Sequence, residues 1–327
     1  PKQAVLKIFQ GTSMIMETGQ MDGKVVVIGS LNYDIILKTD RMPLKGETHN
    51  AESSQCCCGG KGGNQAVQCA KLGIPTYMAG HVGNDCYGDI LIKGLKAYGV
   101  DTAYVRRTSA ASGMGIVHTL RDGSVFPTIT KGANHTLKHK DVDEIAHLLD
   151  EHTVLILQME IPVQVLEYAI QTAASAGCTI LFNMAPAMEF DETYMKMCHY
   201  LIMNEVEAQF YTGKDLTSVP AARSGLTEFA GKMGNTCIFT LGKQGAMACR
   251  DRGFHYKESY CVKAVETTGA GDSFVGGLAY GVLNHMDLSS MLDFATCCSA
   301  LTVQGTGAQD SMPDIQAVLD FYRNYSK

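Results

Sequence analysis

Long apolar runs and positive charge are both scarce in this sequence. No stretch approaches the roughly 18 uninterrupted apolar residues that a helix needs to cross a bilayer, and the formal net charge of the 327 residues is −6. A negative chain is poorly suited to nucleic acids or acidic membrane surfaces, so we expect no nucleic-acid partner and no membrane association. The hydrophobic fraction of 46% is ample for a buried core and excludes a disordered chain.

The twelve cysteines lack the spacing of a metal site or a disulfide framework. No Cys-x-x-Cys pair occurs, and several cysteines lie in the adjacent runs Cys56–Cys58 and Cys297–Cys298. In a long chain with this pattern, reduced thiols in a cytosolic protein are the expected state. We therefore expect a cytoplasmic location, and a nuclear one as well if the source is eukaryotic.

Residues 1–22 differ from the rest of the chain. They lack a sustained apolar segment and carry Glu17 where a signal peptide would not. We expect an N-terminal extension that is either disordered or foreign to the native protein. Residues 23–327 would then form one folded domain.

Short, continuously apolar runs recur along the chain, as in strands that are buried on both faces. Helical patterns lie between them; the pattern at 162–176, for example, begins with Pro162 and ends before Gly177. Strands that alternate with helices predict a doubly wound, Rossmann-like α/β fold, in which helices cover both faces of a mostly parallel sheet. The predicted buried strands are residues 24–29, 153–158, 178–183, 200–204 and 237–241, and further helices are expected at 288–303 and 313–325.

Two segments, at about residues 33–57 and 104–130, break this alternation. They contain strand-like pieces without an intervening helix, and Asp122-Gly123 separates two such pieces, as is typical of a β-hairpin. We predict a small antiparallel sheet built from both segments. Such a sheet over the ends of the parallel strands would serve as a lid.

Two common phosphate-binding motifs are missing. No Gly-Lys pair is followed by Ser or Thr as in a P-loop, and no Gly-x-Gly-x-x-Gly follows the first strand. Instead, Gly269, Ala270 and Gly271 directly precede Asp272 at a predicted helix start. The glycines allow close approach of a ligand, and the free N–H groups of a helix start favour an anion.

This arrangement suggests chemistry for Asp272. It could deprotonate a hydroxyl while the cradle Gly269–Gly271 holds the charge on a phosphoryl group, and a helix start should favour its ionised form. The alternative is an ordinary glycine-rich turn with an N-terminal aspartate.

Polar residues also follow the first strand. Asn32 and Asp34 lie two positions apart on an extended segment and therefore face the same way, and an amide with a carboxylate suits a polyhydroxylated ligand. The glycine-rich stretch 59–64 precedes a predicted helix at 65–72 and brings a lysine and an asparagine near a helix start. Turn formation and a plain flexible loop are the respective alternatives.

Two later strand ends carry further candidates. Asn204 and Glu207 lie three apart at a helix start, so one helical face could hold Mg²⁺ through waters, with substrate phosphates as the other ligands. An N-cap with a capping-box glutamate is the alternative. The backbone N–H groups around Thr240, Gly242 and Gly245 could meet the phosphates of a nucleotide, unless they form only a tight turn.

Taken together and in their order, these segments resemble the phosphofructokinase-B-like carbohydrate kinases. The resemblance runs from about residue 24 to the C-terminal end, and the Gly-Gly-Lys-Gly-x-Asn block combined with Asn-x-Asp is similar to the ribokinase-like form of the family. The matching stretches are 29–34, 59–66, 131–134, 157–160, 183–187, 204–207, 240–242, 268–272 and 307–309.

The resemblance implies a role for each matching residue. Asp272 would be the base on the primary hydroxyl of the sugar, with the backbone N–H groups of Gly269, Ala270 and Gly271 as an anion hole. The implied sugar-binding residues are Asn32, Asp34, Gly60, Lys61, Asn64, Glu160 and Asp272. The implied nucleotide-binding residues are Asn204, Thr240, Gly242 and Gly245, with Asn204 and Glu207 organising Mg²⁺.

A monovalent cation beside the anion hole is also implied, and here the sequence departs from the family. Glu266 stands where aspartate is common, and Asp310 where proline is usual. Because glutamate reaches one methylene further, K⁺ could bind, bind more weakly or be displaced. The implied cation residues are Glu266, Thr268, Thr302, Gly305, Gly307 and Ser311.

The implied activity is transfer of the γ-phosphoryl group of ATP to the 5-hydroxyl of D-ribose, with Mg²⁺, giving ribose 5-phosphate and ADP. Because the lid sheet of this family often pairs with that of a second subunit, a homodimer is implied. A related kinase acting on a nucleoside, fructose or deoxyribose is the nearest alternative. A non-catalytic sugar-binding protein and a nicotinamide oxidoreductase are further alternatives, and the missing glycine motif disfavours the second.

Overall fold

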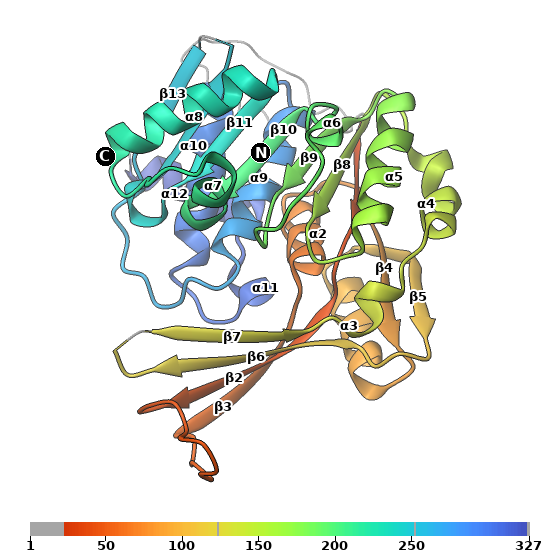
Figure 1. Ribbon diagram of the computed structural model, residues 1–327, viewed down its shortest axis with the longest axis vertical. Coiled ribbons are helices and arrows are strands. Elements are labelled where there is room, and N and C mark those ends of the chain that lie inside the picture. Colours follow the sequence, from red (N-terminus) through yellow and green to blue (C-terminus); the bar gives the residue numbers. More distant parts are fainter. Residues whose placement is uncertain (1–22, 123, 252, 326–327) are drawn as a thin grey trace.

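The computed structural model describes residues 23–122, 124–251 and 253–325, and a nine-stranded sheet forms their centre (Figure 1). Its strand order is β13-β12-β11-β10-β9-β8-β1-β4-β5. The strands from β11 to β5 run parallel, whereas β12 and β13 are antiparallel additions at one edge. Their bounds are β1 Lys24–Ile28, β4 Thr76–Gly83, β5 Asp101–Thr108, β8 Thr153–Gln158, β9 Thr179–Asn183, β10 Tyr200–Asn204, β11 Thr236–Thr240, β12 Ala246–Arg250 and β13 Gly253–Lys257.

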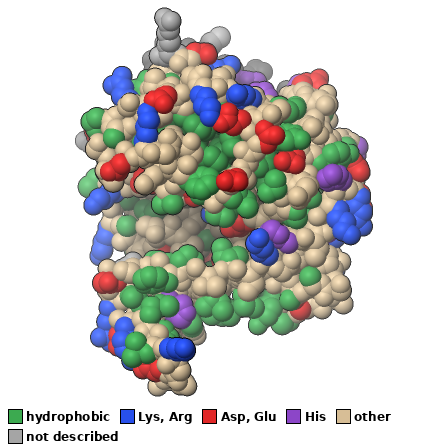
Figure 2. All heavy atoms as spheres, viewed as in Figure 1, with side chains coloured by type: hydrophobic (Ala, Val, Ile, Leu, Met, Phe, Trp, Pro, Cys, Tyr) green, Lys and Arg blue, Asp and Glu red, His purple; other side chains and the backbone are tan. Residues whose placement is uncertain are grey.

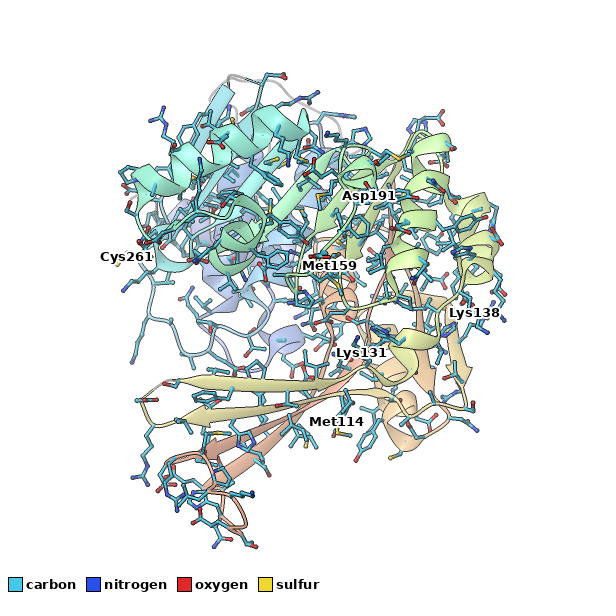
Figure 3. The ribbon with its side chains drawn as sticks, in the orientation of Figure 1. Met114, Lys131, Lys138, Met159, Asp191 and Cys261 are labelled. Carbon is cyan, nitrogen blue, oxygen red and sulfur yellow. The ribbon has the colours of Figure 1, made fainter. Side chains whose placement is uncertain are left out.

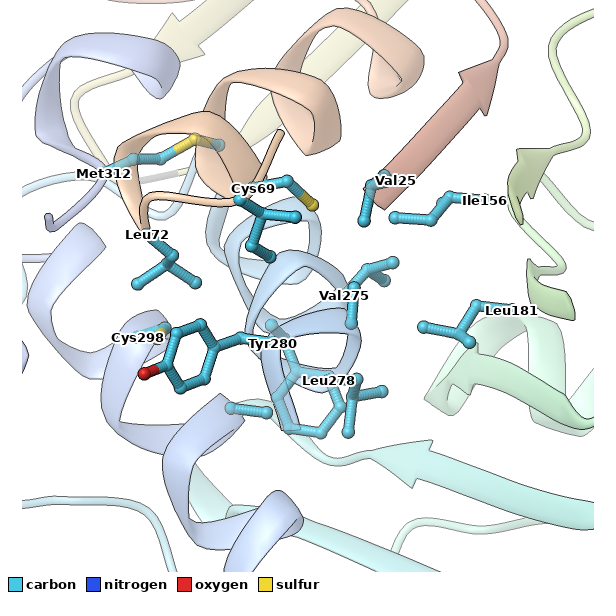
Figure 4. Packing of buried hydrophobic residues seen from close by; sticks show 14 of the residues in the cluster. Val25, Cys69, Leu72, Ile156, Leu181, Val275, Leu278, Tyr280, Cys298 and Met312 are labelled. Carbon is cyan, nitrogen blue, oxygen red and sulfur yellow. The ribbon is translucent and has the colours of Figure 1, made fainter. Parts of the chain in front are cut away.

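Helices cover both faces of this sheet, and each face has its own hydrophobic cluster. Helices α2, α3, α9, α10 and α12 pack on one face, and α4 to α8 on the other. On the first face, Val275 and Leu278 of α9 pack towards the strands that carry Val25 and Leu181 (Figure 4). Burial of apolar side chains on both faces is the main stabilising contribution to such a layered fold.

The helices have the following bounds. The α-helices are α2 Lys61–Lys71, α3 Cys86–Ala97, α4 His139–Ile145, α5 Val163–Ser175, α6 Glu192–Met195, α7 Glu205–Thr212, α8 Val219–Met233, α9 Ala270–Leu283, α10 Leu288–Thr302, α11 Ala308–Ser311 and α12 Ile315–Tyr325. The 3₁₀ helices are η1 Gly132–Thr136, η2 Ala146–Leu148 and η3 Gly242–Gln244.

A second sheet of four strands projects from the main body (Figure 1). It consists of β2 Asn32–Thr39, β3 Ser53–Gly59, β6 Gly113–Leu120 and β7 Val125–Thr130, in the order β3-β2-β6-β7. Its outer pairs are antiparallel, including the predicted hairpin β6–β7, but the central strands β2 and β6 run parallel. Gly123 of that hairpin lies outside the described residues.

The second segment of the small sheet begins at Gly113, later than the predicted residue 104. Residues Asp101–Thr108 form β5, which pairs in parallel with β4 of the large sheet. The reason is that β4, α3 and β5 form a strand–helix–strand unit, whose two strands pair in parallel in one sheet. The second segment of the small sheet is therefore shorter than the predicted range 104–130.

Helix α2 begins at Lys61, before the predicted start at Gln65. A Cβ atom on Gly62 would lie 2.7 Å from the carbonyl carbon of Gly29, so glycine here lets the first turn of α2 pack against the end of β1. Gly60 precedes the helix with a φ of 83°, in the left-handed region. The glycine-rich stretch is thus mostly helix and not the flexible loop that was the alternative, and its close packing is why it contains glycines.

The predicted fold class is confirmed: a mostly parallel sheet carries helices on both faces, with a small separate sheet beside it. Residues 1–22 lie outside the described residues, so the expected extension stays a prediction. Among the described residues no helix is long and apolar enough to span a bilayer. All twelve cysteines are free thiols.

Candidate active site

Asp272 lies in the first turn of α9, where its carboxylate is held from two sides. Gly269 caps the helix with a φ of 79°, a conformation that glycine adopts without strain. From α2, Asn64 Nδ2 donates a hydrogen bond to Asp272 Oδ2, and Gln65 Nε2 donates to Oδ1, both at 2.9 Å. The Asp272 residue is only 8% exposed. Two helices that are far apart in the sequence therefore converge on one carboxylate.

Burial dominates the protonation of Asp272. Burial raises the pKa of Asp272 above its ordinary value, and the charge of Lys61 with the amides of Asn64 and Gln65 offsets only part of this effect. Burial therefore acts against the ionised form that a helix start alone would favour. For Lys61, burial alone would lower the pKa, but the surrounding carboxylates, Asp272 foremost, raise it.

The predicted sugar-binding residues gather around Lys61. Lys61 and Asn64 lie on the first turn of α2, and Glu160 follows β8. Glu160 Oε2 accepts a hydrogen bond from the backbone N–H of Lys61 at 3.3 Å and another from the hydroxyl of Ser30. Charged and amide groups from three parts of the main body thus face one small region.

The region of the predicted sugar-binding residues, called the sugar side below, lies where the small sheet meets the main body. In Figure 3, Met159, next to Glu160, lies in the main body, and Lys131 lies at the base of the small sheet. Asn134, in η1, connects the two: its Oδ1 accepts from the backbone N–H of Leu31 at 2.8 Å, and its Nδ2 donates to Asn32 Oδ1 at 2.7 Å. The side chain of Asn32 is therefore fixed before any ligand binds.

The carboxylate of Asp34 lies between two glycines of the small sheet. A Cβ atom on Gly59 of β3 or on Gly115 of β6 would collide with it, so a side chain at either position would displace this carboxylate. Burial, and then the nearby charge of Glu160, raises the pKa of Asp34 to about 6, although the backbone N–H of Gly115 lowers it. Asp34 therefore titrates close to neutral pH.

A cleft of about 510 Å³ adjoins the first turn of α9, the turn that bears Asp272. The first turn of α9 lines it through Ala270 and Gly271, and the predicted nucleotide-binding residues Asn204, Thr240, Gly242 and Gly245 line it as well. Figure 2 shows the molecular surface hollowed between the small sheet and the main body. Since the first N–H groups of a helix lack intrahelical partners, an anion in the cleft could meet the start of α9.

Asn204 and Glu207 form the capping box of α7. Asn204 Oδ1 accepts from the backbone N–H groups of Val206 and Glu207 at 2.8 and 3.0 Å, and Glu207 Oε2 accepts from the backbone N–H of Asn204 at 2.7 Å. Both side chains therefore cap the helix, as the alternative to a metal site predicted. Asn204 also lines the cleft. Burial raises the pKa of Glu207. Within the described residues no group of three or more His, Cys, Asp or Glu could hold a metal, so Mg²⁺ would need phosphate and water ligands.

Among the predicted cation residues, Glu266 is the one with an unmet interaction. Its Oε2 accepts a hydrogen bond from the backbone N–H of Gly307 at 3.0 Å, whereas its Oε1 is buried without a hydrogen-bond partner. A buried carboxylate oxygen without a partner is costly, and a monovalent cation would satisfy it. The glutamate at this position therefore fits a cation on chemical grounds.

The other predicted cation residues contribute differently. The hydroxyl of Thr302 is buried and already bonded to Ser273 Oγ at 2.8 Å and to the Cys298 carbonyl at 2.9 Å, so its side chain is engaged. Gly305 packs closely against Ser311, and Thr268 is exposed. Asp310, which stands where the family usually has proline, accepts a hydrogen bond from the hydroxyl of Tyr98.

The buried glutamines around the site were not among the residues predicted from the sequence. Gln65 contacts Asp272 directly, Gln158 Nε2 donates to Gln65 Oε1 at 2.7 Å, and Gln309 Nε2 donates to Asn64 Oδ1 at 3.1 Å. One indication was available: Gln158 ends a strand that is otherwise apolar. A polar side chain in such a place normally has a specific partner.

Comparisons with known proteins show which family this chain resembles. The pattern of the pfkB family carbohydrate kinases matches residues 22–315. The chain is 34% identical over 295 residues to the deoxyribokinase of Salmonella typhi, covering 89% of this chain and 96% of that protein. It is 34% identical over 307 residues to the ribokinase of Schizosaccharomyces pombe, covering 90% and 96%. The structure of Arabidopsis thaliana ribokinase complexed with ribose and ATP has a TM-score of 0.83 and 28% identity, covering 92% and 99%. The chain therefore belongs to the pfkB family of carbohydrate kinases.

Proposed function

We propose that this kinase transfers the γ-phosphoryl group of ATP to the 5-hydroxyl of D-ribose, giving ribose 5-phosphate and ADP. The position of Asp272 carries the proposal. Its carboxylate faces the polar cluster around Lys61, and the helix turn that bears it lines the cleft with Asn204 and Gly242. One carboxylate thus lies between a site for hydroxyl groups and a site for phosphates.

In this proposal Asp272 accepts the proton of the sugar hydroxyl as the oxygen attacks the γ-phosphorus. The transition state of phosphoryl transfer is loose, so positioning and charge neutralisation contribute more than strong basicity. The raised pKa of Asp272 makes it a better proton acceptor once it is ionised. The N–H groups of Gly269 and Gly271 would stabilise the charge on the transferring group, and that of Ala270 would join them by giving up its 3.2 Å hydrogen bond to the Thr267 carbonyl. Lys61 and Asn64 hold the acceptor sugar beside this carboxylate.

Two metal ions belong to the proposal. Mg²⁺, bound with ATP, would neutralise phosphate charge, and Asn204 and Glu207 are the residues that would orient it through water. A monovalent cation, K⁺, would lie at the loop of Glu266, whose unpartnered buried oxygen supports it. The backbone groups of the same loop would complete that site.

The choice between ribose and 2-deoxyribose depends on the sugar side. One relative is named a deoxyribokinase and another a ribokinase, so similarity alone supports both sugars. Asp34 and Asn32 favour ribose, since a carboxylate and an amide suit adjacent hydroxyl groups. A site that hydrogen-bonds a hydroxyl discriminates against the analogue that lacks it.

A homodimer through the small sheet is also part of the proposal. The edge strand β7 exposes Val125, Phe126 and Ile129 by 52, 45 and 50%. An apolar edge strand of this kind is a hazard unless it is covered, and a second copy would cover it. The cytoplasmic and nuclear locations remain predictions.

The proposal is tested by measuring ADP release with ribose, 2-deoxyribose, fructose and a panel of nucleosides, each with and without K⁺. We expect the highest kcat/KM with ribose, a lower value with 2-deoxyribose, and higher rates with K⁺. A tenfold preference for a nucleoside or fructose would contradict the proposal that ribose is the substrate. Absence of ADP formation with every acceptor would favour a non-catalytic sugar-binding protein.

A further inference from the structure

Gln65 makes a fixed set of hydrogen bonds that the proposed mechanism does not use. It is fully buried on α2, and its Nε2 donates to Asp272 Oδ1 at 2.9 Å and to Asn183 Oδ1 at 3.2 Å. Its Oε1 accepts from Gln158 Nε2 at 2.7 Å. All three partners come from different elements: α9, the end of β9 and the end of β8. The amide is therefore surrounded by groups that select one orientation.

The orientation follows from donor and acceptor chemistry. With its NH₂ group towards Asp272, Gln65 satisfies two acceptor oxygens, while its own oxygen meets the NH₂ group of Gln158. A flipped amide would turn its oxygen to the carboxylate and its NH₂ group to that of Gln158, losing these bonds. The NH₂ group and the oxygen of Gln65 are thus paired, although Oε1 of Gln158 is buried without a hydrogen-bond partner. Buried groups that are paired in this way are held rigidly.

We infer that Gln65 is a positioning residue for the catalytic base, an inference that rests on the role proposed for Asp272. Gln65 fixes the rotamer of the carboxylate from one side, as Asn64 does from the other. Each amide is in turn held by a glutamine from another element, Gln158 for Gln65 and Gln309 for Asn64. Of these two, Asn64 also belongs to the predicted sugar site, so Gln65 is the amide whose contacts are purely internal to the protein.

Besides fixing the position of the carboxylate, Gln65 acts on its charge. Hydrogen bonds to a carboxylate favour its charged form, so Gln65 offsets part of the effect of burial on Asp272. The other charged groups that act on Asp272 are Lys61 on α2, Glu160 after β8 and Asp34 on β2. Loss of the Gln65 amide leaves these charges unchanged, and Asp272 then loses its proton at a higher pH.

The decisive variant is Gln65→Leu, with Gln68→Leu as its matched control. Gln68 is equally buried on the same helix, but it bonds to Ser273 Oγ at 2.7 Å and to the Pro313 carbonyl at 2.9 Å rather than to Asp272. For Gln65→Leu we expect kcat to fall roughly tenfold to a hundredfold with little change in the KM for ATP, and the acid limb of the kcat–pH profile to move to higher pH. Gln68→Leu lowers stability without moving that limb.

A direct titration separates this inference from the proposed function. The carboxyl ¹³C resonance of Asp272, assigned by its absence in Asp272→Asn, is followed against pH in the wild-type protein and in Gln65→Leu. An upward shift of the titration in Gln65→Leu supports the inference even if no sugar is phosphorylated. An unchanged titration, or an equal shift in Gln68→Leu, overturns it.

A second variant covers the case in which Gln65→Leu does not fold. Gln65→Glu keeps the shape of the side chain and places a second carboxyl group against Asp272 Oδ1. Two carboxyl groups at this distance share a proton, so the pair should titrate in two separated steps. A single step at the wild-type position would overturn the inference.

Discussion

On the sugar side of the candidate active site, the carboxylates of Asp34, Glu160 and Asp272 surround Lys61, and internal hydrogen bonds hold their neighbours. On the nucleotide side, the cleft is lined mostly by small and apolar residues, and its charged lining residues among those described are Glu205 and Lys243. The first side concentrates buried charge, whereas the second offers shape and backbone N–H groups.

This difference supports the ligands proposed for the two sides. Buried, preorganised polar groups discriminate between acceptors by their hydroxyl groups, because an unmatched group stays unpaired. A cleft with few charges suits the apolar face of a base, and leaves the phosphates to metal ions and the helix start. Substitutions on the sugar side should therefore act through burial and pKa, and those on the nucleotide side through metal and salt.

The largest effect is expected for Asp272→Asn. The variant removes the proton acceptor and turns an NH₂ group towards one of the amides that hold Asp272, so turnover should fall by about 10²–10⁴-fold. Ribose binding should remain detectable by calorimetry, since the rest of the sugar side is intact. Asp320→Asn, an exposed change on α12, is the control. Near-normal turnover of Asp272→Asn would contradict its role as the base.

Asp34→Asn should separate binding from stability. The pKa of Asp34 is raised from 3.8 to about 6, so its ionisation destabilises the folded protein at pH 7 by roughly 3 kcal/mol. This cost is absent below the unfolded pKa and grows as pH rises towards 6. The asparagine variant should thus be more stable at pH 7, with a gain that shrinks as pH falls to 4. Loss of a charge-assisted bond should weaken ribose binding about 10–100-fold.

Denaturant unfolding at both pH values and ribose calorimetry measure these effects. The exposed variant Asp320→Asn should change stability by no more than about 0.5 kcal/mol at either pH. If Asp34→Asn destabilises the protein at pH 7, the burial of a charged Asp34 is not the controlling effect. If ribose affinity is unchanged, Asp34 does not contact the sugar.

The layers of the fold were predictable because hydrophobic periodicity reports burial directly. The apolar runs at 153–158 and 200–204 coincide with β8 and β10. Prediction failed where tertiary packing decides. Lys61–Asn64 is helical because glycines allow α2 to approach β1, and β5 joins the large sheet because a strand–helix–strand unit places it there. Neither the packing of α2 against β1 nor the pairing of β5 can be read from the local pattern of apolar residues.

The candidate site was predictable to the extent that its residues lie in glycine-rich turns and strand ends. Asp272 and Asn64 meet at 2.9 Å although they lie on different helices, and family order had already assigned both. The internal amides were not found, because a glutamine such as Gln65 has no distinctive local spacing. The raised pKa of Asp272 was also missed, since desolvation depends on every neighbouring element.

On the nucleotide side, Glu207→Gln tests whether the capping box also serves the metal. Glutamine can still accept the hydrogen bond from the Asn204 backbone, so α7 should keep its cap. Loss of the negative charge should raise the Mg²⁺ concentration for half-maximal activity by about tenfold, on the order of one charged contact. Glu207→Ala removes cap and charge together and should cost about 1 kcal/mol of stability in addition. If Glu207→Gln has a normal Mg²⁺ response, Glu207 only caps the helix.

The smallest effect is expected for Lys243→Gln. Lys243 is exposed at the rim of the cleft, so its attraction to nucleotide phosphates is weakened by solvent, and the KM for ATP should rise about threefold to fivefold with kcat unchanged. Because exposed charges are screened, the difference from wild type should disappear at about 0.5 M salt. Lys93→Gln, exposed on α3, is the control.

The pH-dependent effect of Asp34→Asn should persist at the same salt concentration, since buried charges are screened much less. Equal salt sensitivity of both variants would remove the distinction between a buried sugar side and an open nucleotide side.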